Sequence, residues 1–487
     1  MADASRSAVD LLREALAYVD SWLDYRVWRL RTPGAQVAIW FDGALQFSKA
    51  YGVSNLDTGE PLTTAHLFRI ASHSKTFTAT AIMQLVEAGK LRLDDTAGSW
   101  LPALAEAGSP LANATVRQLV SHSAGVRRDG IDATFWALNR PFPDEAALLE
   151  LALDDGAVRQ PDATFKYTNI GFGLLGLIVG KAAGCTYAEY VETAITGKLG
   201  LRNTGPELDA ARQSEYAGGH SGLGSWTERQ VIPHVDTQAM AAATGFYSTA
   251  EEMVQFASAH FFGDDRLISD RSKNEMQRPV WTGLSPDAPQ DGYGYGTIVR
   301  HYDGHRLVGH SGGYPGHITR TVWDPHEGLA ISVLTNAVDG PAEELAAGIV
   351  KLLDKARAVR PKVPLSSGLV NSAALVPPAA SDREIALDSF TGRFAGLWGV
   401  TDVFILGGKL FASSPATPSP LLEPIELAVI DEDTLRIMGG SPYGSVGELY
   451  RYERDANGKV VSLYTGGMQT WPIEEYRARG NVLDTGA

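Results

Sequence analysis

The order of the predicted elements is the feature that most constrains the fold of this 487-residue chain. Strand patterns stand at both ends of its first 360 residues, and helical patterns with Gly-, Pro- and Asp-rich loops fill the middle, from about residue 72 to 290. The two groups of strands can share one core only if they pair across the helical part. The sequence therefore predicts an α+β domain over residues 1–360, with one antiparallel sheet built from both ends, terminal helices on one face and a helical subdomain beside it.

Hydrophobic periodicity assigns the elements of this domain. Residues 5–30 predict an amphipathic helix, and Glu343–Val359 predicts another. The first two strands, Gln36–Trp40 and Leu45–Tyr51, flank the hairpin signal Phe41-Asp42-Gly43. The later strands are predicted at Tyr293–Arg300, Arg306–Gly309, Ile318–Trp323 and Leu329–Asn336.

A second region follows a Pro-, Ser- and Ala-rich stretch, residues 361–382, which predicts a linker. Residues 383–487 contain short strands separated by turns, which predicts a separate antiparallel β-barrel of lipocalin-like type. The clearest strands are Val403–Leu406, Lys409–Ala412, Ile425–Ile430, Thr434–Met438, Glu448–Arg454 and Lys459–Tyr464.

Charge and cysteine content exclude several functions. Asp and Glu number 57 against 42 Lys and Arg, and the net charge of −15 disfavours nucleic acids and anionic membranes as partners. The single cysteine, Cys185, permits no intramolecular disulfide and no Cys-based metal site. No apolar run predicts a signal peptide or a membrane span. We expect a cytoplasmic protein without a metal or cofactor, and the sequence leaves its oligomeric state open.

The first chemical motif is Ser72-His73-Ser74-Lys75, at the head of the apolar helix Thr76–Ala88. Positions i and i+3 of a helix share a face, so the Lys75 amine can reach the Ser72 hydroxyl. Burial would lower the affinity of Lys75 for its proton and let it act as a base toward Ser72. A capped helix with a surface lysine explains the same four residues when they are taken alone.

Two further motifs carry polar groups next to apolar elements. Tyr167-Thr168-Asn169 precedes the apolar helix Phe172–Ala183; the phenol can pass a proton, and the amide can bind a substrate or orient a lysine. His310-Ser311-Gly312-Gly313 ends the predicted strand Arg306–Gly309, where paired glycines let backbone N–H groups approach a ligand. A packed Tyr with a turn Asn, and a glycine-rich hairpin, are the structural alternatives.

Together, the order and spacing of the three motifs resemble those of the serine β-lactamase and penicillin-binding-protein family, over residues 5–358. The resemblance is strongest to class C β-lactamases, DD-peptidases, and the related esterases and D-aminopeptidases. Several connecting segments agree with it, among them Phe68–Ala71, Thr115–Val126, Thr244–Met253 and Val333–Asn336.

The resemblance implies a role for each motif residue. Ser72 corresponds to the nucleophile and Lys75 to its base, while Tyr167 corresponds to the residue that shuttles protons. Asn169 corresponds to the contact for the substrate amide and the lysine. Backbone N–H groups of Ser72 and Gly313 would form the oxyanion hole, with His310 and Gly312 also at the substrate site.

One position departs from the β-lactamase pattern. His310-Ser311-Gly312 stands where these enzymes usually have Lys-Thr-Gly. A histidine of ordinary pKa, near ~6.5, is mostly neutral at pH 7, whereas lysine supplies a fixed charge for the carboxylate of a β-lactam. We therefore expect weak or no β-lactamase activity, unless another cation such as Arg320 supplies the charge.

Other interpretations stay open at this stage. Gly309–Gly313 also matches Gly-x-Ser-x-Gly, but a nucleophile elbow at Ser311 needs a helix directly after it, and strand-like sequence follows instead. His73 is expected at the pocket rim, and Trp398, Trp471 and Tyr476 in the core of the barrel. The barrel is expected to shape the substrate site, with Gly439–Ser445 as the loop that reaches over it.

The sequence thus predicts a serine hydrolase that forms an acyl-enzyme with a small ester, amide or short peptide. The alternatives are a peptide-cyclising or acyl-transferring relative and a non-catalytic binding protein of the same fold. The retention of Ser72, Lys75, Tyr167 and Asn169 argues against the non-catalytic alternative. The identity of the acyl and leaving groups, and any preference for D or L substrates, stay open.

Overall fold

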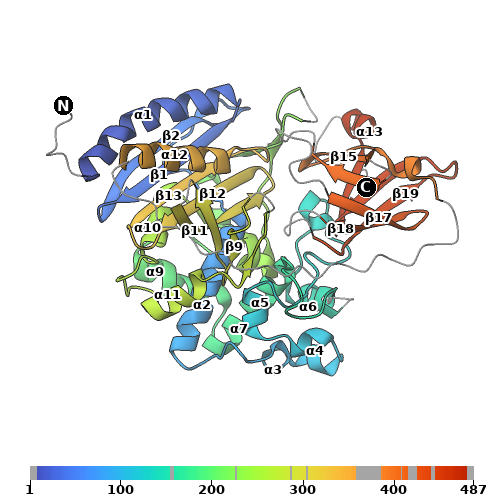
Figure 1. Cartoon of the computed structure of the whole chain (residues 1–487), viewed down its shortest axis with the longest axis horizontal. Helices are drawn as coiled ribbons and strands as arrows, with labels where there is room; N and C mark the ends of the chain where they lie inside the picture. The colour runs from blue at the N-terminus through green and yellow to red at the C-terminus, as the bar shows by residue number, and fades with distance from the viewer. Residues whose placement is uncertain are drawn as a thin grey trace.

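The computed structural model describes residues 8–153, 158–224, 227–285, 288–302, 305–357, 385–406, 409–414, 425–439 and 445–479. An α+β body contains a large sheet with helices on both sides, and a β-barrel lies beside its helical part (Figure 1). The predicted linker, residues 361–382, lies outside the described residues.

The sheet of the body has nine strands in the order β3-β2-β1-β13-β12-β11-β10-β9-β8. All its pairings are antiparallel, and β1 from the start of the chain lies next to β13 from the end of the body, as the element order predicted. The strands are β1 Gly34–Phe41, β2 Ala44–Asn55, β3 Glu60–Pro61, β8 Trp281–Thr282, β9 Gly292–Tyr293, β10 Ile298–Tyr302, β11 His305–Tyr314, β12 His317–Asp324 and β13 Leu329–Thr335.

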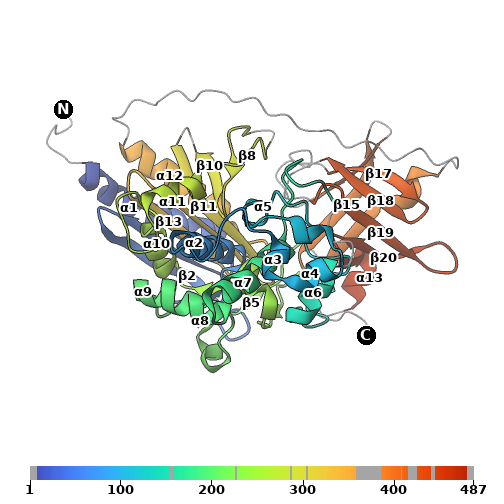
Figure 2. The ribbon, with the colours of Figure 1, turned by 90° about the horizontal axis from the view of Figure 1, so that it is seen from below.

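Helices cover both faces of this sheet (Figures 1 and 2). The two predicted terminal helices, α1 Ala8–Arg29 and α12 Ala342–Arg357, pack together on one face, where their apolar side chains join those of β1 and β13 in one core cluster. On the other face, α10 Ala250–Ser258 lies against β1 and β13.

The helical part of the body packs beside and below α2 Ser74–Glu87 (Figure 2). Its centre is the buried helix α7 Asn169–Ala183, which contacts α2 directly. The remaining α-helices of this part are α3 Ala97–Trp100, α4 Pro102–Glu106, α5 Val116–Val120, α6 Glu145–Leu153, α8 Tyr187–Val191, α9 Gly197–Leu199 and α11 Asp270–Gln277. Short two-stranded pairs, β4 Phe68–Arg69 with β7 Tyr247–Ser248 and β5 Gly219–His220 with β6 Val231–Ile232, complete it.

Within the described ranges, no single helix is long and apolar enough to cross a membrane, although the bent pair Asn169–Ala183 and Tyr187–Leu199 meets that criterion by length and composition.

The predicted strand Tyr293–Arg300 is wrong as one element, because it is a tight hairpin of β9 and β10. The turn between them reaches α2: Thr76 Oγ1 donates to the carbonyl of Gly296 at 2.7 Å. Gly296 has φ +60°, and a Cβ there would lie 2.5 Å from the Lys75 carbonyl oxygen. A glycine is therefore required where the sheet meets the helix that carries Lys75.

The predicted strand Arg306–Gly309 is too short, because β11 runs on through His310, Ser311 and both glycines to Tyr314. Gly312 pairs with Thr319 and Gly313 with Ile318 of β12. The third motif therefore belongs to the sheet itself. The element that directly follows β11 is the strand β12 and not a helix, so the nucleophile-elbow interpretation is wrong.

The C-terminal strands form a closed eight-stranded antiparallel barrel, and each strand pairs with the next along the chain. The predicted strands are present; the first and last strands, which close the barrel, were not predicted. The strands are β14 Gly392–Gly396, β15 Gly399–Leu406, β16 Lys409–Ser413, β17 Ile425–Asp431, β18 Thr434–Gly439, β19 Leu449–Arg454, β20 Val460–Thr465 and β21 Met468–Pro472, followed by α13 Ile473–Ala478.

The barrel packs closely against the body. The backbone N–H of Ala133 donates to the carbonyl of Gly467 in the β20–β21 turn at 3.0 Å. Ile232 and Val338 of the body share one buried apolar cluster with Leu397 and Val400 of the barrel. Apolar burial and hydrogen bonds together hold the two parts in contact.

Candidate active site

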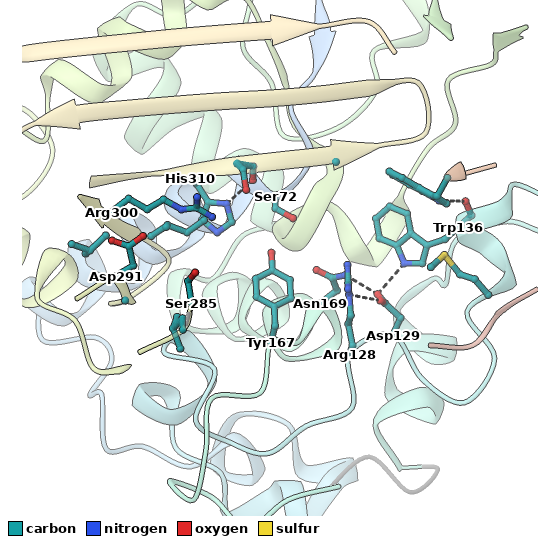
Figure 3. A pocket seen from close by; sticks show the side chains of 18 residues that line it. Ser72, Arg128, Asp129, Trp136, Tyr167, Asn169, Ser285, Asp291, Arg300 and His310 are labelled. Carbon is teal, nitrogen blue, oxygen red and sulfur yellow. Dashed lines mark hydrogen bonds and ion pairs between the residues drawn. The ribbon is translucent and has the colours of Figure 1, made fainter. Parts of the chain in front are cut away.

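Ser72 lies on a 3₁₀ turn, Ala71–His73, directly before α2, and not on the α-helix that the spacing argument assumed. Ala71 has φ +48°, an uncommon conformation for a residue with a Cβ. The hydroxyl of Ser74 stabilises this turn, since it donates to the Ala71 carbonyl at 2.6 Å and accepts from the Phe246 N–H at 3.1 Å. The turn presents Ser72 to a cavity of about 520 Å³ (Figure 3).

The amine of Lys75 lies within hydrogen-bond distance of three oxygens. Its Nζ is 3.2 Å from Ser72 Oγ, 2.7 Å from Asn169 Oδ1 and 2.8 Å from the carbonyl oxygen of Ala243. The latter two only accept, so a neutral amine would use its two N–H bonds on them and turn its lone pair toward Ser72. Burial lowers the pKa of Lys75 well below its ordinary value; the nearby Asp129 carboxylate opposes that shift and Arg128 adds to it.

Asp129 fixes the orientation of the Asn169 amide. Its Oδ1 accepts from Asn169 Nδ2 at 2.7 Å and from Trp136 Nε1 at 2.9 Å, and its Oδ2 lies 3.1 Å from Arg128 Nε. Because the amide N–H bonds to Asp129, the amide oxygen is directed to Lys75. This buried carboxylate was not predicted from the sequence.

Tyr167 lies across the cavity from Ser72, with its hydroxyl turned toward the serine (Figure 3). Lys75 Nζ is 4.8 Å from the centroid of its ring. His122 packs against the same ring, with centroids 4.3 Å apart, and His122 Nδ1 accepts from the Thr168 N–H at 3.1 Å. His122 thus supports the Tyr167 segment from behind, as a buried histidine of the core.

His310 is buried at the edge of the same cavity. Its Nε2 lies 3.2 Å from the Tyr293 hydroxyl, and its Nδ1 lies 2.6 Å from the Ser311 carbonyl oxygen. Burial, with smaller contributions from Lys75 and His73, lowers the pKa of His310 well below its ordinary value. His310 is therefore neutral at pH 7 and supplies no fixed charge.

The glycines of the third motif allow β11 to approach the serine turn. A Cβ on Gly312 would lie 2.1 Å from the Ile70 carbonyl oxygen and 3.0 Å from His73 Nδ1, so no larger residue fits there. His73 is itself buried, which corrects the expectation of a rim position. Gly313 lines the cavity next to Ser72.

The barrel supplies part of the cavity wall. Trp398, in the β14–β15 turn, and Met468, at the start of β21, line it together with Trp136 of the body. Trp398 Nε1 donates to the Trp136 carbonyl at 3.3 Å, and the two indoles meet edge to face. The prediction that Trp398 lies in the barrel core is wrong. Trp471 and Tyr476 are buried, but in the cluster that the barrel shares with the body, and not in the cluster formed by barrel residues alone. Most of the predicted covering loop, Gly439–Ser445, lies outside the described residues.

Charged groups stand at two places in the cavity wall. Arg128 lies beside Asp129 and Tyr167, whereas Arg300 and Asp291 lie beside His310 (Figure 3). Arg320, the cation considered from the sequence, is buried, pairs with Glu343 at 2.9 Å and does not line the cavity. Among the described residues, no group of three or more His, Cys, Asp or Glu is arranged to hold a metal ion.

The sequence-predicted residues converge on one place. The cavity is lined by Ser72, Tyr167, Asn169, His310 and Gly313. Lys75 does not line the cavity but contacts Ser72 Oγ, and Gly312 allows β11 to lie close to the turn that carries Ser72. Sequence reasoning missed Asp129, Trp136, Trp398 and Met468. Asp129 follows the family-like segment Thr115–Val126 after only two residues, Arg127 and Arg128. This proximity is the feature of the sequence that could have pointed to Asp129 as a site residue.

Buried neutral histidines make the protein sensitive to acid. Burial lowers the pKa of His73 to about 3 and of His260 to about 4, and it lowers the pKa values of His122, His310 and His317 well below the ordinary value. Below pH ~6.5 the unfolded chain binds protons at these histidines and the native state does not, so each of them lowers the stability as the pH falls. For His73 and His260 the loss between pH ~6.5 and ~5 is on the order of 2 kcal/mol each.

We therefore predict that the urea midpoint is nearly constant from pH 8 to 7 and falls steeply between pH 6.5 and 5. The variant His317→Leu should flatten part of this fall, because neither ring nitrogen of His317 has a hydrogen-bond partner among the described residues. Equal urea midpoints at pH 7.5 and 5.5 would contradict the prediction.

Comparisons with known proteins agree with the resemblance seen in the motifs. A family model described as Beta-lactamase matches residues 19–354. Penicillin-binding protein 4 of Amycolatopsis lactamdurans is 30% identical over 325 residues, which cover 62% of this chain and 81% of that protein.

Solved structures extend the similarity to the barrel. SurE, in its structure with D-Leu, is 26% identical with a TM-score of 0.59, and the match covers 95% of this chain and 99% of that one. D-amino acid amidase from Ochrobactrum anthropi SV3, complexed with D-phenylalanine, has a TM-score of 0.59 at 24% identity. That match covers 71% of this chain and 100% of the amidase chain, and it concerns the fold alone.

Proposed function

This chain belongs to the Beta-lactamase family, a fold family of hydrolases, and we propose that it is a serine hydrolase that forms a covalent acyl-enzyme with ester, amide or short-peptide substrates. The observation that carries this proposal is the buried Lys75 amine, 3.2 Å from Ser72 Oγ, with its other contacts made to two acceptors. A lysine held in this way is suited to remove a proton from the serine.

In the proposed acylation step, Ser72 Oγ attacks the substrate carbonyl carbon while its proton passes to Lys75. The N–H groups of Ser72 and Gly313 stabilise the oxyanion that forms. Tyr167 then delivers a proton to the leaving oxygen or nitrogen, the bond to the leaving group breaks, and the acyl group stays on Ser72 as an ester. Asn169 orients Lys75 and binds the substrate amide.

In deacylation, a water molecule attacks the carbonyl carbon of the ester and gives one proton to the deprotonated Tyr167 oxygen. The bond between the acyl carbon and Ser72 Oγ then breaks, the carboxylic acid is released, and Ser72 Oγ regains its proton from Lys75. An amine in place of water would give acyl transfer or, within one peptide, cyclisation. Acyl transfer to an amine is therefore a second candidate outcome, which the choice of acceptor in an activity assay can distinguish from hydrolysis.

The charges of the cavity argue against efficient β-lactam hydrolysis. His310 is buried, and its lowered pKa keeps it neutral at the position where β-lactamases carry lysine. Arg300 and Arg128 do line the cavity, but each is paired with a carboxylate, Arg300 with Glu343 at 3.2 Å and Arg128 with Asp129 at 3.1 Å. We therefore propose that neutral acyl groups are preferred over anionic ones.

The aromatic part of the wall favours an apolar acyl group. Trp136, Trp398 and Met468 form a surface of large, weakly hydrated side chains at one side of the cavity. The structure of SurE with D-Leu makes an apolar D-residue a suitable first probe for the acyl group and for the acceptor.

For Trp398→Ala, we predict a loss of selectivity rather than a loss of chemistry. The kcat/KM for p-nitrophenyl esters with long or aromatic acyl groups should fall ~10–100-fold, since a missing apolar contact removes ~1–3 kcal/mol, while acetate esters change less than ~3-fold. Trp28→Ala, at an exposed tryptophan on α1, is the matched control and should change neither. An equal loss for all acyl lengths would contradict the prediction.

An activity panel tests the proposed function directly. We suggest p-nitrophenyl esters, D- and L-amino-acid amides and a chromogenic cephalosporin, each with and without an added amine acceptor. Hydrolysis of esters or amides with slow cephalosporin turnover is expected, and ligation products would identify the acyl-transfer alternative. No turnover and no covalent label on Ser72 would favour a non-catalytic binding protein.

A further inference from the structure

A carboxylate of the barrel is buried inside the α+β body. Glu448, directly before β19, contacts Lys166 Nζ through its Oε1, and the same oxygen accepts from the backbone N–H of Arg128 at 3.1 Å. The side chains of Lys166 and Glu448 are only 1% and 3% exposed. Most ion pairs among the described residues have at least one partner partly exposed to solvent, whereas both partners of this pair are buried where the barrel meets the chain segments that contain Lys166 and Arg128.

Both contacts of Glu448 lead directly to the candidate active site. Lys166 precedes Tyr167, and its own N–H donates to the His122 carbonyl at 2.9 Å. Arg128 precedes Asp129, and its carbonyl accepts from the N–H groups of Asn169 at 2.8 Å and Ile170 at 3.1 Å, at the start of α7. One carboxylate therefore joins the Tyr167 segment to the Asp129 segment.

The burial of Lys166 makes this carboxylate necessary. Burial lowers the pKa of Lys166, and Glu448 acts in the opposite direction by favouring the charged form. A buried ammonium without its counter-ion carries a large desolvation penalty. Without Glu448, the Lys166 ammonium would therefore lose its proton, or the chain segment around Lys166 would shift until the ammonium reached water. Either change acts at the residue next to Tyr167.

We propose that Glu448 is a positioning residue, through which the barrel holds Tyr167 and Asn169 in the geometry needed for proton transfer at Ser72. Glu448 does not line the main cavity and touches no reacting atom, so it acts only through Lys166 and Arg128. This inference rests on the proposed function. It assigns the barrel a part in the rate of reaction that is separate from the contact of Trp398 with substrate.

The test compares Glu448→Gln with the double variant Lys166→Met/Glu448→Gln in the full-length chain. Glu448→Gln should lower kcat ~10–100-fold and slow the labelling of Ser72 by a fluorophosphonate, with KM changed less than ~3-fold, since a displaced acid–base group affects the chemical step. The double variant should recover at least ~3-fold of the lost kcat, because it removes the unpaired cation. It also provides a folded protein if Glu448→Gln alone does not fold.

The matched control is Lys273→Met, which removes another fully buried lysine. Lys273 pairs with Asp270 at 2.9 Å, and both residues belong to α11, a helix that contributes no residue to the cavity wall. It should lower the melting temperature and leave kcat unchanged. The proposal is overturned if Glu448→Gln lowers the melting temperature but keeps kcat and the labelling rate within ~3-fold of wild type, or if the double variant is no faster than the single one. Inactive, unlabelled wild type would instead refute the proposed function, so the two failures are distinguishable.

Discussion

Replacing Ser72 with alanine should reduce turnover of the best ester in the panel by ~10⁴–10⁶-fold, the range found when the nucleophile of a serine hydrolase is removed. The expectation follows from the position of Ser72 at the cavity, on a turn that the Ser74 hydroxyl stabilises, with Lys75 Nζ at 3.2 Å. A fluorophosphonate should add one covalent mass to the wild-type protein, on the peptide that contains Ser72, and none to Ser72→Ala.

The control for this experiment is a second serine in the same cavity wall. Ser311 also lines the cavity, but it is a residue of β11 with no adjacent amine base in the described structure. Ser311→Ala should therefore keep the label on Ser72. A label on Ser311, or turnover by Ser72→Ala at more than about a tenth of the wild-type rate, would refute the assignment of the nucleophile.

The sequence predicted those parts of the fold that local patterns determine. The hairpin around Asp42-Gly43 and the amphipathic helices α1 and α12 follow from periodicity and turn chemistry, and they bring β1 beside β13. The error at Tyr293–Arg300 has a tertiary cause. Gly296 looks like an interruption within a strand, and only the approach of α2 makes it the turn of a hairpin.

The limits of prediction at the site have the same origin. Ser72 and Lys75 are close in sequence, so their geometry could be derived from helical spacing. Asp129 contacts Asn169 from 40 positions away, and Glu448 reaches Lys166 from 282 positions away, so no spacing rule relates either pair. Trp398 was assigned to the barrel core because tryptophan in a β-meander usually packs inside; the body that the barrel covers provides its actual partner, Trp136.

Lys75→Met should lower kcat/KM by ~10²–10⁴-fold, the usual contribution of a positioned general base. The pH dependence gives the more specific signature. A base must be unprotonated, so the wild-type rate should rise with pH up to the pKa of Lys75 and then level off. Because burial lowers this pKa well below the ordinary value for lysine, that rise should end at a lower pH than a solvent-exposed lysine would give.

Tyr167→Phe separates the two proton-transfer roles. It should also lower turnover by ~10²–10⁴-fold, but the loss should be greater for amides than for p-nitrophenyl esters, because an amide nitrogen must be protonated to leave whereas p-nitrophenolate leaves unaided. Lys75→Met should affect both substrates equally, since every substrate requires an activated Ser72. Turnover within a few-fold of wild type in both variants, or a pH profile unchanged in Lys75→Met, would exclude the proposed proton path through Lys75 and Tyr167.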